Sequence, residues 1–165
     1  MGHTKQQLKK GFTIIEVMIV LAIAGLIMLI VLIAIPQLQR NQRNTARKNI
    51  VGRIKTEIDS YTGNNNGNIP ASAADLTSLT TRYLSGVNLK DPSSGSNMSL
   101  TYTTGAGSAS PGSIPTGAAL PAIGGINYQT SSTCNGESVV TGGTARQYAM
   151  WTQLEGGAIQ CLDNQ

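Results

Sequence analysis

The sequence predicts an α+β protein, in which a long N-terminal α-helix packs on a small antiparallel β-sheet head. Three observations predict this fold class. Residues 12–35 are almost entirely apolar and carry a single charge, on Glu16. Apolar residues then recur with helical spacing as far as residue 61. Residues 63–165, the head, are rich in Gly, Ser, Thr and Asn and contain only short strand-like runs.

The apolar run is long enough to cross a membrane as a helix. Its roughly 24 residues would rise about 36 Å, which exceeds a hydrocarbon thickness of about 30 Å. A secretory signal would instead have an apolar region of about 7–15 residues, followed by an Ala-x-Ala-like cleavage site. No such site follows Pro36. We therefore expect a transmembrane first half of the helix, over residues 12–36.

A second apolar pattern extends the helix beyond the membrane segment. After a mostly polar stretch that follows Pro36, apolar residues recur on one helical face at Ile50, Val51, Ile54, Ile58 and Tyr61. Gly63 and the Asn-rich run after it suit a helix end, because Gly and Asn tolerate the left-handed conformation. The pattern predicts one helix over 12–62, whose amphipathic second half covers residues 37–62.

The head shows signals for one short helix and four strands. Ser72 and Asp75 form a variant of the capping box, which predicts a helix from about Ala73 to Tyr83. The predicted strands cover residues 99–103, 126–130, 147–154 and 158–162, and a Gly-Gly turn joins the last two. We expect Tyr148, Met150 and Leu154 to face the helix. Residues 105–125 lack periodicity and are predicted to form a long loop.

The charge is divided unevenly along the chain. The net charge is +4, with three lysines in residues 1–11 and six basic residues in 40–55. Beyond residue 55 acids outnumber bases by seven to three. The basic residues spread around the helix, and no aromatic residue lies among them to stack on bases, which disfavours nucleic-acid binding. We expect them to be solvated or to pair with acids of neighbouring molecules.

Cys134 and Cys161 both lie in the head and fit a single disulfide formed in an oxidising compartment. The alternative is two free thiols in a cytosolic protein, and the membrane segment argues against it. The expected disulfide favours a head outside the cytoplasm. The basic residues flanking the apolar run weakly favour the opposite orientation.

The start of the apolar run resembles the class III signal of type IV pilins and related pseudopilins. The resemblance rests on Lys10-Gly11 followed by Phe12-Thr13-Ile14-Ile15-Glu16 and then an uncharged span. It implies that residues 1–11 are a leader, which a prepilin peptidase removes between Gly11 and Phe12 on the cytoplasmic side. It also implies that the same enzyme methylates the new amine of Phe12.

Glu16 is the acid that the apolar run must accommodate. A charge in such a segment is unfavourable unless a partner compensates it. The resemblance implies that Glu16 meets the Phe12 amine of a neighbouring subunit and so sets the register of packed helices. The alternative is a plain membrane anchor, in which Glu16 reaches the membrane interface.

Two residues are expected to weaken the helix. Gly25 has the position usual in the family, whereas Pro36 lies about one helical turn later than in familiar members. Glycine is a poor helix former and proline removes a helical hydrogen bond. The segment between them is where the helix is expected to bend or melt in a filament.

The resemblance implies a structural subunit that polymerises through its N-terminal helix into a surface filament for adhesion, twitching motility or DNA uptake. Implied partners are further copies of the chain, the prepilin peptidase, and a pilus assembly platform with minor pilins. DNA or a host surface is a further possible partner. The chain would lie first in the inner membrane and then in an extracellular pilus. The alternatives are a minor pilin, a type II secretion pseudopilin, or a membrane-anchored module that binds DNA or surfaces without polymerising.

The sequence shows no group of residues typical of a catalytic, cofactor or metal site, so we do not expect an enzyme. His3 is the only histidine. The head acids are scattered singly and are expected to be solvated; they include Asp75, Asp91, Glu137, Glu155 and Asp163. No Asp-x-Asp or Cys-x-x-Cys spacing suggests calcium or zinc, and the missing calcium pattern disfavours a secretion pseudopilin.

Overall fold

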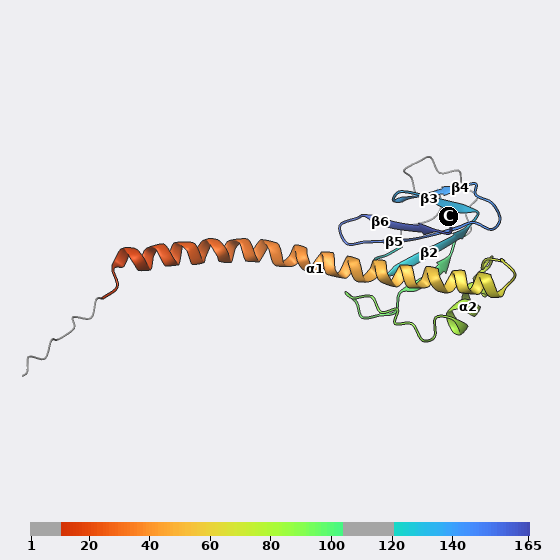
Figure 1. Cartoon of the computed structure of the whole chain (residues 1–165), viewed down its shortest axis with the longest axis horizontal. Coiled ribbons are helices and arrows are strands. Elements are labelled where there is room, and N and C mark those ends of the chain that lie inside the picture. The colour runs from red at the N-terminus through yellow and green to blue at the C-terminus, as the bar shows by residue number, and fades with distance from the viewer. Residues whose placement is uncertain (1–10, 104–120) are drawn as a thin grey trace, which may run out of the picture. The chain divides into compact units, whose positions relative to one another are not determined.

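The computed structural model describes residues 11–103 and 121–165 (Figure 1). The chain divides into two units, Met1–Gln39 and Arg40–Gln165, and helix α1 (Ile14–Asn64) contributes to both. Among its described residues, the second unit also contains helix α2 (Ala73–Arg82) and six strands. This confirms the predicted α+β fold. The predicted leader, apart from Gly11, and most of the predicted loop 105–125 lie outside the described residues.

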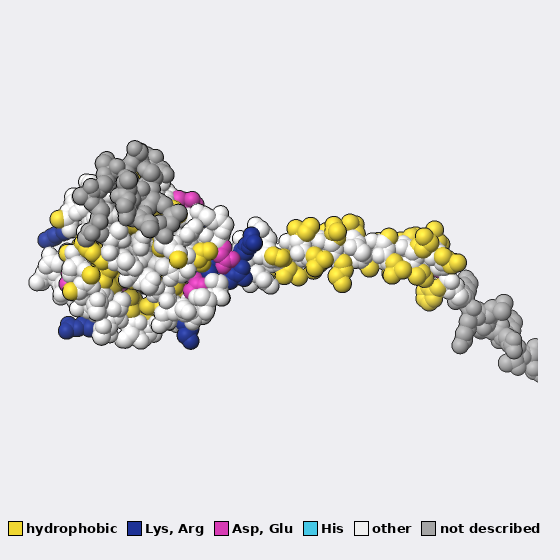
Figure 2. Space-filling view, turned by 180° about the vertical axis from the view of Figure 1, so that it is seen from behind, with side chains coloured by type: hydrophobic (Ala, Val, Ile, Leu, Met, Phe, Trp, Pro, Cys, Tyr) yellow, Lys and Arg dark blue, Asp and Glu magenta, His cyan; other side chains and the backbone are white. Residues whose placement is uncertain are grey.

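The described part of the first unit, residues 11–39, is mainly an apolar helix from Ile14 onward, and its side chains are all exposed. Exposed fractions of its large apolar residues run from 39% at Val31 to 91% at Phe12. Hydrophobic side chains follow the helix along the face drawn in Figure 2. By length and composition, this part of α1 can cross a membrane.

The second half of α1 buries one stripe, as its spacing predicts. Val51, Ile54 and Ile58 are each at most 1% exposed. They pack in one core with side chains of the sheet and of α2, including Ile126, Tyr128, Tyr148, Met150, Leu76 and Leu79. The helix ends in a turn in which the Gly67 N–H donates to the Thr62 carbonyl at 2.9 Å. Asn66 and Gly67 both have positive φ there, which Asn and Gly tolerate best.

A four-stranded sheet covers this face of α1 in the order β1-β2-β5-β6. Its strands are β1 (Ser99–Tyr102), β2 (Gly125–Thr130), β5 (Tyr148–Gln153) and β6 (Ile159–Asp163). The predicted antiparallel pairing holds for β2–β5 and β5–β6, whereas β1 and β2 pair in parallel. Parallel neighbours need a long connection, and residues 103–124 supply it.

A separate hairpin was not predicted from the sequence. Strands β3 (Ser132–Asn135) and β4 (Ser138–Thr141) pair antiparallel around the two-residue turn Gly136-Glu137. Gly136 has φ 63°, a conformation that glycine adopts readily at such a turn. Each strand is only four residues long, which leaves little periodicity to detect.

The hairpin packs on the sheet face opposite α1. Alternation along β5 sends Tyr148 and Met150 toward α1, and Ala149 and Trp151 to the other face. Trp151 is fully buried there against Val139 of β4. A disulfide joins Cys134 of β3 to Cys161 of β6, with Cα atoms 5.8 Å apart. It therefore ties the hairpin to the sheet beside Trp151.

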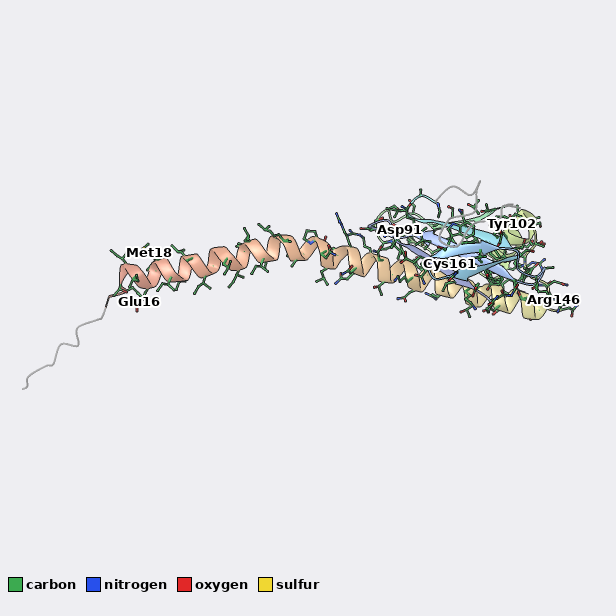
Figure 3. All side chains as sticks on the ribbon, turned by 90° about the horizontal axis from the view of Figure 1, so that it is seen from above. Glu16, Met18, Asp91, Tyr102, Arg146 and Cys161 are labelled. Atoms are coloured by element: carbon green, nitrogen blue, oxygen red, sulfur yellow. A yellow bond between two sulfur atoms is a disulfide. The ribbon has the colours of Figure 1, made fainter. Side chains whose placement is uncertain are left out.

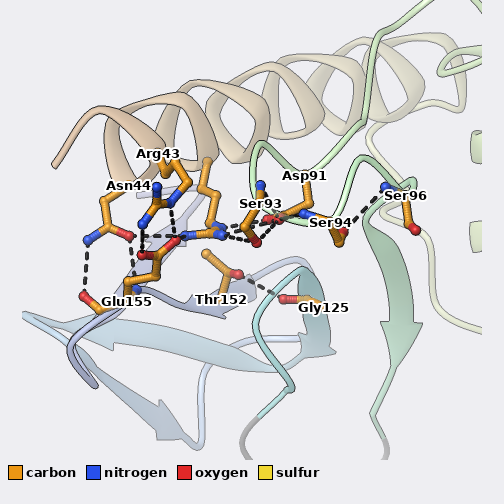
Figure 4. A network of polar contacts seen from close by, with 10 residues as sticks. Arg43, Asn44, Asp91, Ser93, Ser94, Ser96, Gly125, Thr152 and Glu155 are labelled. Carbon is orange, nitrogen blue, oxygen red and sulfur yellow. Dashed lines mark hydrogen bonds and ion pairs between the residues drawn. The ribbon is translucent and has the colours of Figure 1, made fainter. Parts of the chain in front are cut away.

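A cluster of ion pairs joins α1 to two loops of the second unit (Figure 4). The fully buried Arg47 guanidinium donates to Asp91 through Nε and Nη2, and to Glu155 through Nη1 at 2.9 Å. Arg43 donates to both carboxylate oxygens of Glu155 at 2.7 Å. The Asn44 side-chain oxygen accepts a hydrogen bond from the Glu155 N–H, and the Asn44 amide nitrogen donates to the Glu155 carbonyl.

This cluster corrects two expectations. Asp91 and Glu155 are not solvated surface acids, since Asp91 is 2% exposed and both are ion-paired. Arg43 and Arg47 pair with acids of their own chain. Arg47 lies four and seven residues before Val51 and Ile54, on the stripe that faces the core, and a charge buried there requires counter-charges.

The ion pairs shift the carboxylate pKa values. Hydrogen bonds from Arg47, followed by those from Ser93 and Ser94, hold the pKa of Asp91 well below its usual range despite burial. Hydrogen bonds from Arg43 and then Arg47 lower the pKa of Glu155 to about 2. Both groups therefore favour the folded state when they are ionised.

We predict that acid destabilises the second unit through this cluster. Both carboxylates have lower pKa values in the folded protein than in the unfolded chain. Their contribution is thus complete above about pH 4.5 and is lost as the pH falls through about 2. The loss should be about 1–3 kcal/mol once solvent screening is allowed for. Urea unfolding of the full chain in detergent, followed by Trp151 fluorescence from pH 7 to pH 2, measures it.

An Arg47→Met variant is the matched test. It should be less stable at pH 7, because Asp91 stays buried without its main partner, and its stability should change less on acidification. Lys55→Met, which removes a partly exposed pair with Asp59, should keep the wild-type pH dependence. Equal acid sensitivity in Arg47→Met and wild type would contradict the assignment.

We predict that removing the disulfide destabilises the second unit by about 3.5 kcal/mol, the loop-closure value for cysteines separated by 27 residues. The change is Cys134→Ser together with Cys161→Ser, and urea unfolding with Trp151 fluorescence measures it. Wild-type protein treated with a thiol reductant should match the double variant. A loss below about 1 kcal/mol in both would show that packing alone holds the hairpin on the sheet.

Candidate functional site

The chain immediately before α1 is exposed and lies outside regular secondary structure. Gly11, Phe12 and Thr13 precede the first helical residue, Ile14. A Cβ atom built on Gly11 would meet nothing within 4 Å, and Phe12 is 91% exposed. The peptide bond between Gly11 and Phe12 is thus open to another protein in this conformation.

Glu16 has a partner within its own chain, Thr13, that was not among the sequence-based predictions. The Thr13 N–H and the Thr13 hydroxyl both donate to Glu16 Oε2, at 2.8 and 2.7 Å. The Glu16 N–H donates to Thr13 Oγ1 at 3.3 Å. This is a capping box, and the spacing of Thr13 and Glu16 is the signal that could have revealed it. Glu16 therefore stabilises the start of α1 within its own chain, where the helix favours a negative charge.

The capping box leaves half of the carboxylate available. Glu16 Oε1 accepts no hydrogen bond from the residues that the structure describes. A carboxylate has two oxygens and about four acceptor positions, so a cation can bind Glu16 while Thr13 keeps Oε2. Local capping and an ion pair with another group are compatible.

The surroundings of Glu16 are apolar. It lies beside a shallow cavity of about 530 Å³ lined by Phe12, Val17, Val20 and Leu21. Within residues 11–39 it is the only ionisable side chain. A positive partner for it must therefore come from the lysines that precede Gly11, from a chain terminus or from another molecule. The apolar side chains and the single carboxylate of this segment suit association with an apolar surface that carries one positive charge.

The other predicted site residues lie further along the chain. Gly25 and Pro36 are both inside α1, which continues through them in this structure. A Cβ on Gly25 would meet nothing within 4 Å, so nothing in the single chain requires glycine there. Cys134 and Cys161 lie in the second unit and are bonded to each other. The structure thus places Gly11, Phe12 and Glu16 together and the remaining residues elsewhere.

Metal ligands do not gather in the described part of the chain, where no three His, Cys, Asp or Glu side chains form a group that could hold an ion.

Comparison with known proteins identifies the N-terminal segment. Residues 7–32 match the family model of the prokaryotic N-terminal methylation motif. Comparison with curated proteins and with solved structures finds no match. The motif is that of type IV pilin-like and pseudopilin proteins, and its implied processing by a prepilin peptidase fits a membrane-anchored precursor. Residues 7–32 carry the class III prepilin signal of type IV pilin-like proteins.

Proposed function

We propose that this protein is the major structural subunit of a type IV pilus and polymerises through α1 into a surface filament. The observation that carries the proposal is an apolar helix, exposed on all sides, that begins within the prepilin signal and holds one carboxylate. Exposed apolar surface of this extent marks contact with lipid or with other protein. A pilin has both in succession, first the membrane and then the filament.

Maturation is the first step of the proposal. The prepilin peptidase cuts between Gly11 and Phe12 and methylates the new amine of Phe12. The exposed, non-helical chain at these residues supports cleavage there. Because the cut precedes the apolar run, the mature protein keeps its membrane segment. The precursor lies in the inner membrane with the head on the extracytoplasmic side, where its disulfide can form.

Assembly then depends on the amine that cleavage creates. The amine of Phe12 is a cation at the edge of an apolar helix, and Glu16 of a neighbouring copy offers the free oxygen Oε1. A helix that docks at the wrong height would bury both charges without partners. The ion pair therefore fixes the register, while the apolar side chains of residues 12–36 bury one another and supply the cohesion.

Gly25 and Pro36 have a separate part in the proposal. Pro36 lacks an N–H and cannot make its helical hydrogen bond, and Gly25 favours the helix less than other residues do. We place a bend or a melted stretch of α1 between them when the helix packs in a filament. Partners beyond further copies of this chain are the assembly platform and minor pilins. The filament serves adhesion, twitching motility or DNA uptake outside the cell.

A minor pilin or a pseudopilin is the second candidate, because the same motif serves both. The abundance of the chain in purified filaments distinguishes a major pilin from these alternatives. A major pilin forms most of the mass of purified filaments, whereas a minor subunit is present in few copies.

We predict that Gly11→Val leaves the precursor uncut, because a branched side chain replaces the smallest residue at the cleavage point. The uncut protein should be heavier than the mature chain by about 1.2 kDa, the mass of residues 1–11. Mass spectrometry of the wild type should show an N-methylated Phe12 at its start. Gly25→Val is the matched control and should be cut normally. Wild-type chains that retain Lys9 and Lys10 in membranes and filaments would refute the maturation step.

We predict that Glu16→Ala and Glu16→Gln both insert into the membrane but fail to form filaments. Glutamine can replace glutamate in a capping box, so Glu16→Gln keeps the helix start and removes only the charge. The measurement is the yield of filaments sheared from cells, beside the amount of the chain in membranes. Assembly by Glu16→Gln but not by Glu16→Ala would show that capping, and not the ion pair, is what assembly requires. Wild-type yields from both variants would rule out any role of Glu16.

A further inference from the structure

The second unit has a polar cavity that filament assembly through residues 12–36 does not use. It measures about 490 Å³ and lies where α1 ends. Its walls combine the end of α1, the Asn-rich turn after it, the start of α2 and the chain before β5. The polar lining includes Tyr61, Asn65, Asn66, Asn68, Asp75 and Arg146. Figure 3 shows Arg146 at this end of the second unit.

The cavity is built by segments that the fold holds in place. Ile69 is 7% exposed and belongs to the core shared by α1 and the sheet, so it anchors the Asn-rich turn. Ser72 caps α2 through the Asp75 N–H, which fixes Asp75 at the cavity wall. Asn164 donates to the Arg146 carbonyl at 2.8 Å and holds the chain before β5.

The lining offers acceptors in fixed positions. The Asn65 amide nitrogen donates to the Tyr61 carbonyl at 2.8 Å, which leaves the Asn65 side-chain oxygen as an acceptor. Asp75 uses Oδ2 for the Ala71 N–H and the Ser72 hydroxyl, and its Oδ1 accepts nothing from the described residues. Two acceptors are thus oriented by bonds made on their other atoms.

The lining also offers donors. The Arg146 guanidinium makes no ion pair or hydrogen bond with any residue that the structure describes. The same holds for the side-chain amides of Asn66 and Asn68. Burial raises the pKa of the Tyr61 phenol, so its hydroxyl remains protonated and can donate. Ile69 and the Tyr61 ring add a small apolar wall.

We propose that this cavity binds a carbohydrate, at the scale of one or two sugar units at the end of a glycan. A sugar presents alternating hydroxyl donors and acceptors and a small apolar C–H face, which match the amides, Asp75, Arg146 and the Tyr61–Ile69 wall. The cavity volume is within the range of about 300–1,000 Å³ that small-molecule sites occupy.

Other ligand classes fit less well. A nucleic acid is bound mainly through several phosphates, each facing Lys or Arg. This cavity has one arginine, and the Asp75 carboxylate would repel a phosphate. A largely apolar ligand would cover the side-chain amides of Asn66 and Asn68, which have no partner among the described residues, and this is unfavourable.

The test uses the full-length protein in a detergent without a sugar headgroup. Binding to a glycan microarray identifies the sugar, and isothermal titration with that sugar gives its affinity. Asn68→Ala and Arg146→Ala should each weaken binding about tenfold, since each removes hydrogen bonds to the ligand. Ala145→Trp, which fills the cavity and removes no polar side chain, should abolish binding. The matched control is Arg53→Ala, an exposed arginine of α1 outside the cavity, which should bind as wild type does.

Trp151 fluorescence in urea shows whether each alanine variant keeps its fold. Circular dichroism in urea does so for Ala145→Trp, which carries a second tryptophan, and only folded variants are compared. Failure to retain any glycan would overturn the proposal, as would wild-type affinity in both Arg146→Ala and Ala145→Trp. Salt-sensitive binding of single-stranded DNA that Arg146→Ala abolishes, with no glycan bound, would also overturn it and identify an anion site instead.

Discussion

The structure depends on one constraint, which is that the first half of α1 is apolar on every side and cannot remain in water. Lipid or other protein must cover it. Glu16 is the one group in this segment that lipid does not solvate. Thr13 satisfies one of its oxygens within the chain, and the other is left for a cation. The same helix therefore suits a membrane and a helical bundle, and in the proposed filament the charge on Glu16 would distinguish one register from another.

The second half of α1 differs from the first because one of its faces is buried in the head, and that face includes a charged residue as well as apolar ones. Val51, Ile54 and Ile58 fill the core, and Arg47 continues the same stripe with a guanidinium. Burial of that charge is tolerated because Asp91 and Glu155 reach it from two separate loops. The ion pairs thus attach the loops that carry Asp91 and Glu155 to α1. The disulfide holds the hairpin on the sheet face opposite α1.

Much of this arrangement could be predicted because its signals are local. Helical spacing predicted α1 and α2, alternation predicted the two faces of β5, and the two cysteines had only each other as partners. The pairing of Arg47 with Asp91 and Glu155 depends on contacts across 44 and 108 residues, which no local pattern records. The hairpin β3–β4 was too short to show periodicity, and the parallel pairing of β1 with β2 is set by the tertiary fold. The Thr13–Glu16 capping box was visible in the sequence and was overlooked. The roles of Gly11, Phe12 and Glu16 remain predictions.

The position of the ion-pair cluster has a mechanical consequence. Tension applied along α1 would enter the second unit at Arg40 and reach Arg43, Asn44 and Arg47 within about two helical turns. These side chains connect to Asp91 and to Glu155, and Glu155 lies in the turn between β5 and β6, so part of the force would pass to two loops as well as to the apolar core. A pull along α1 would therefore be shared among several attachment points of the second unit and would not act through the apolar stripe of α1 alone.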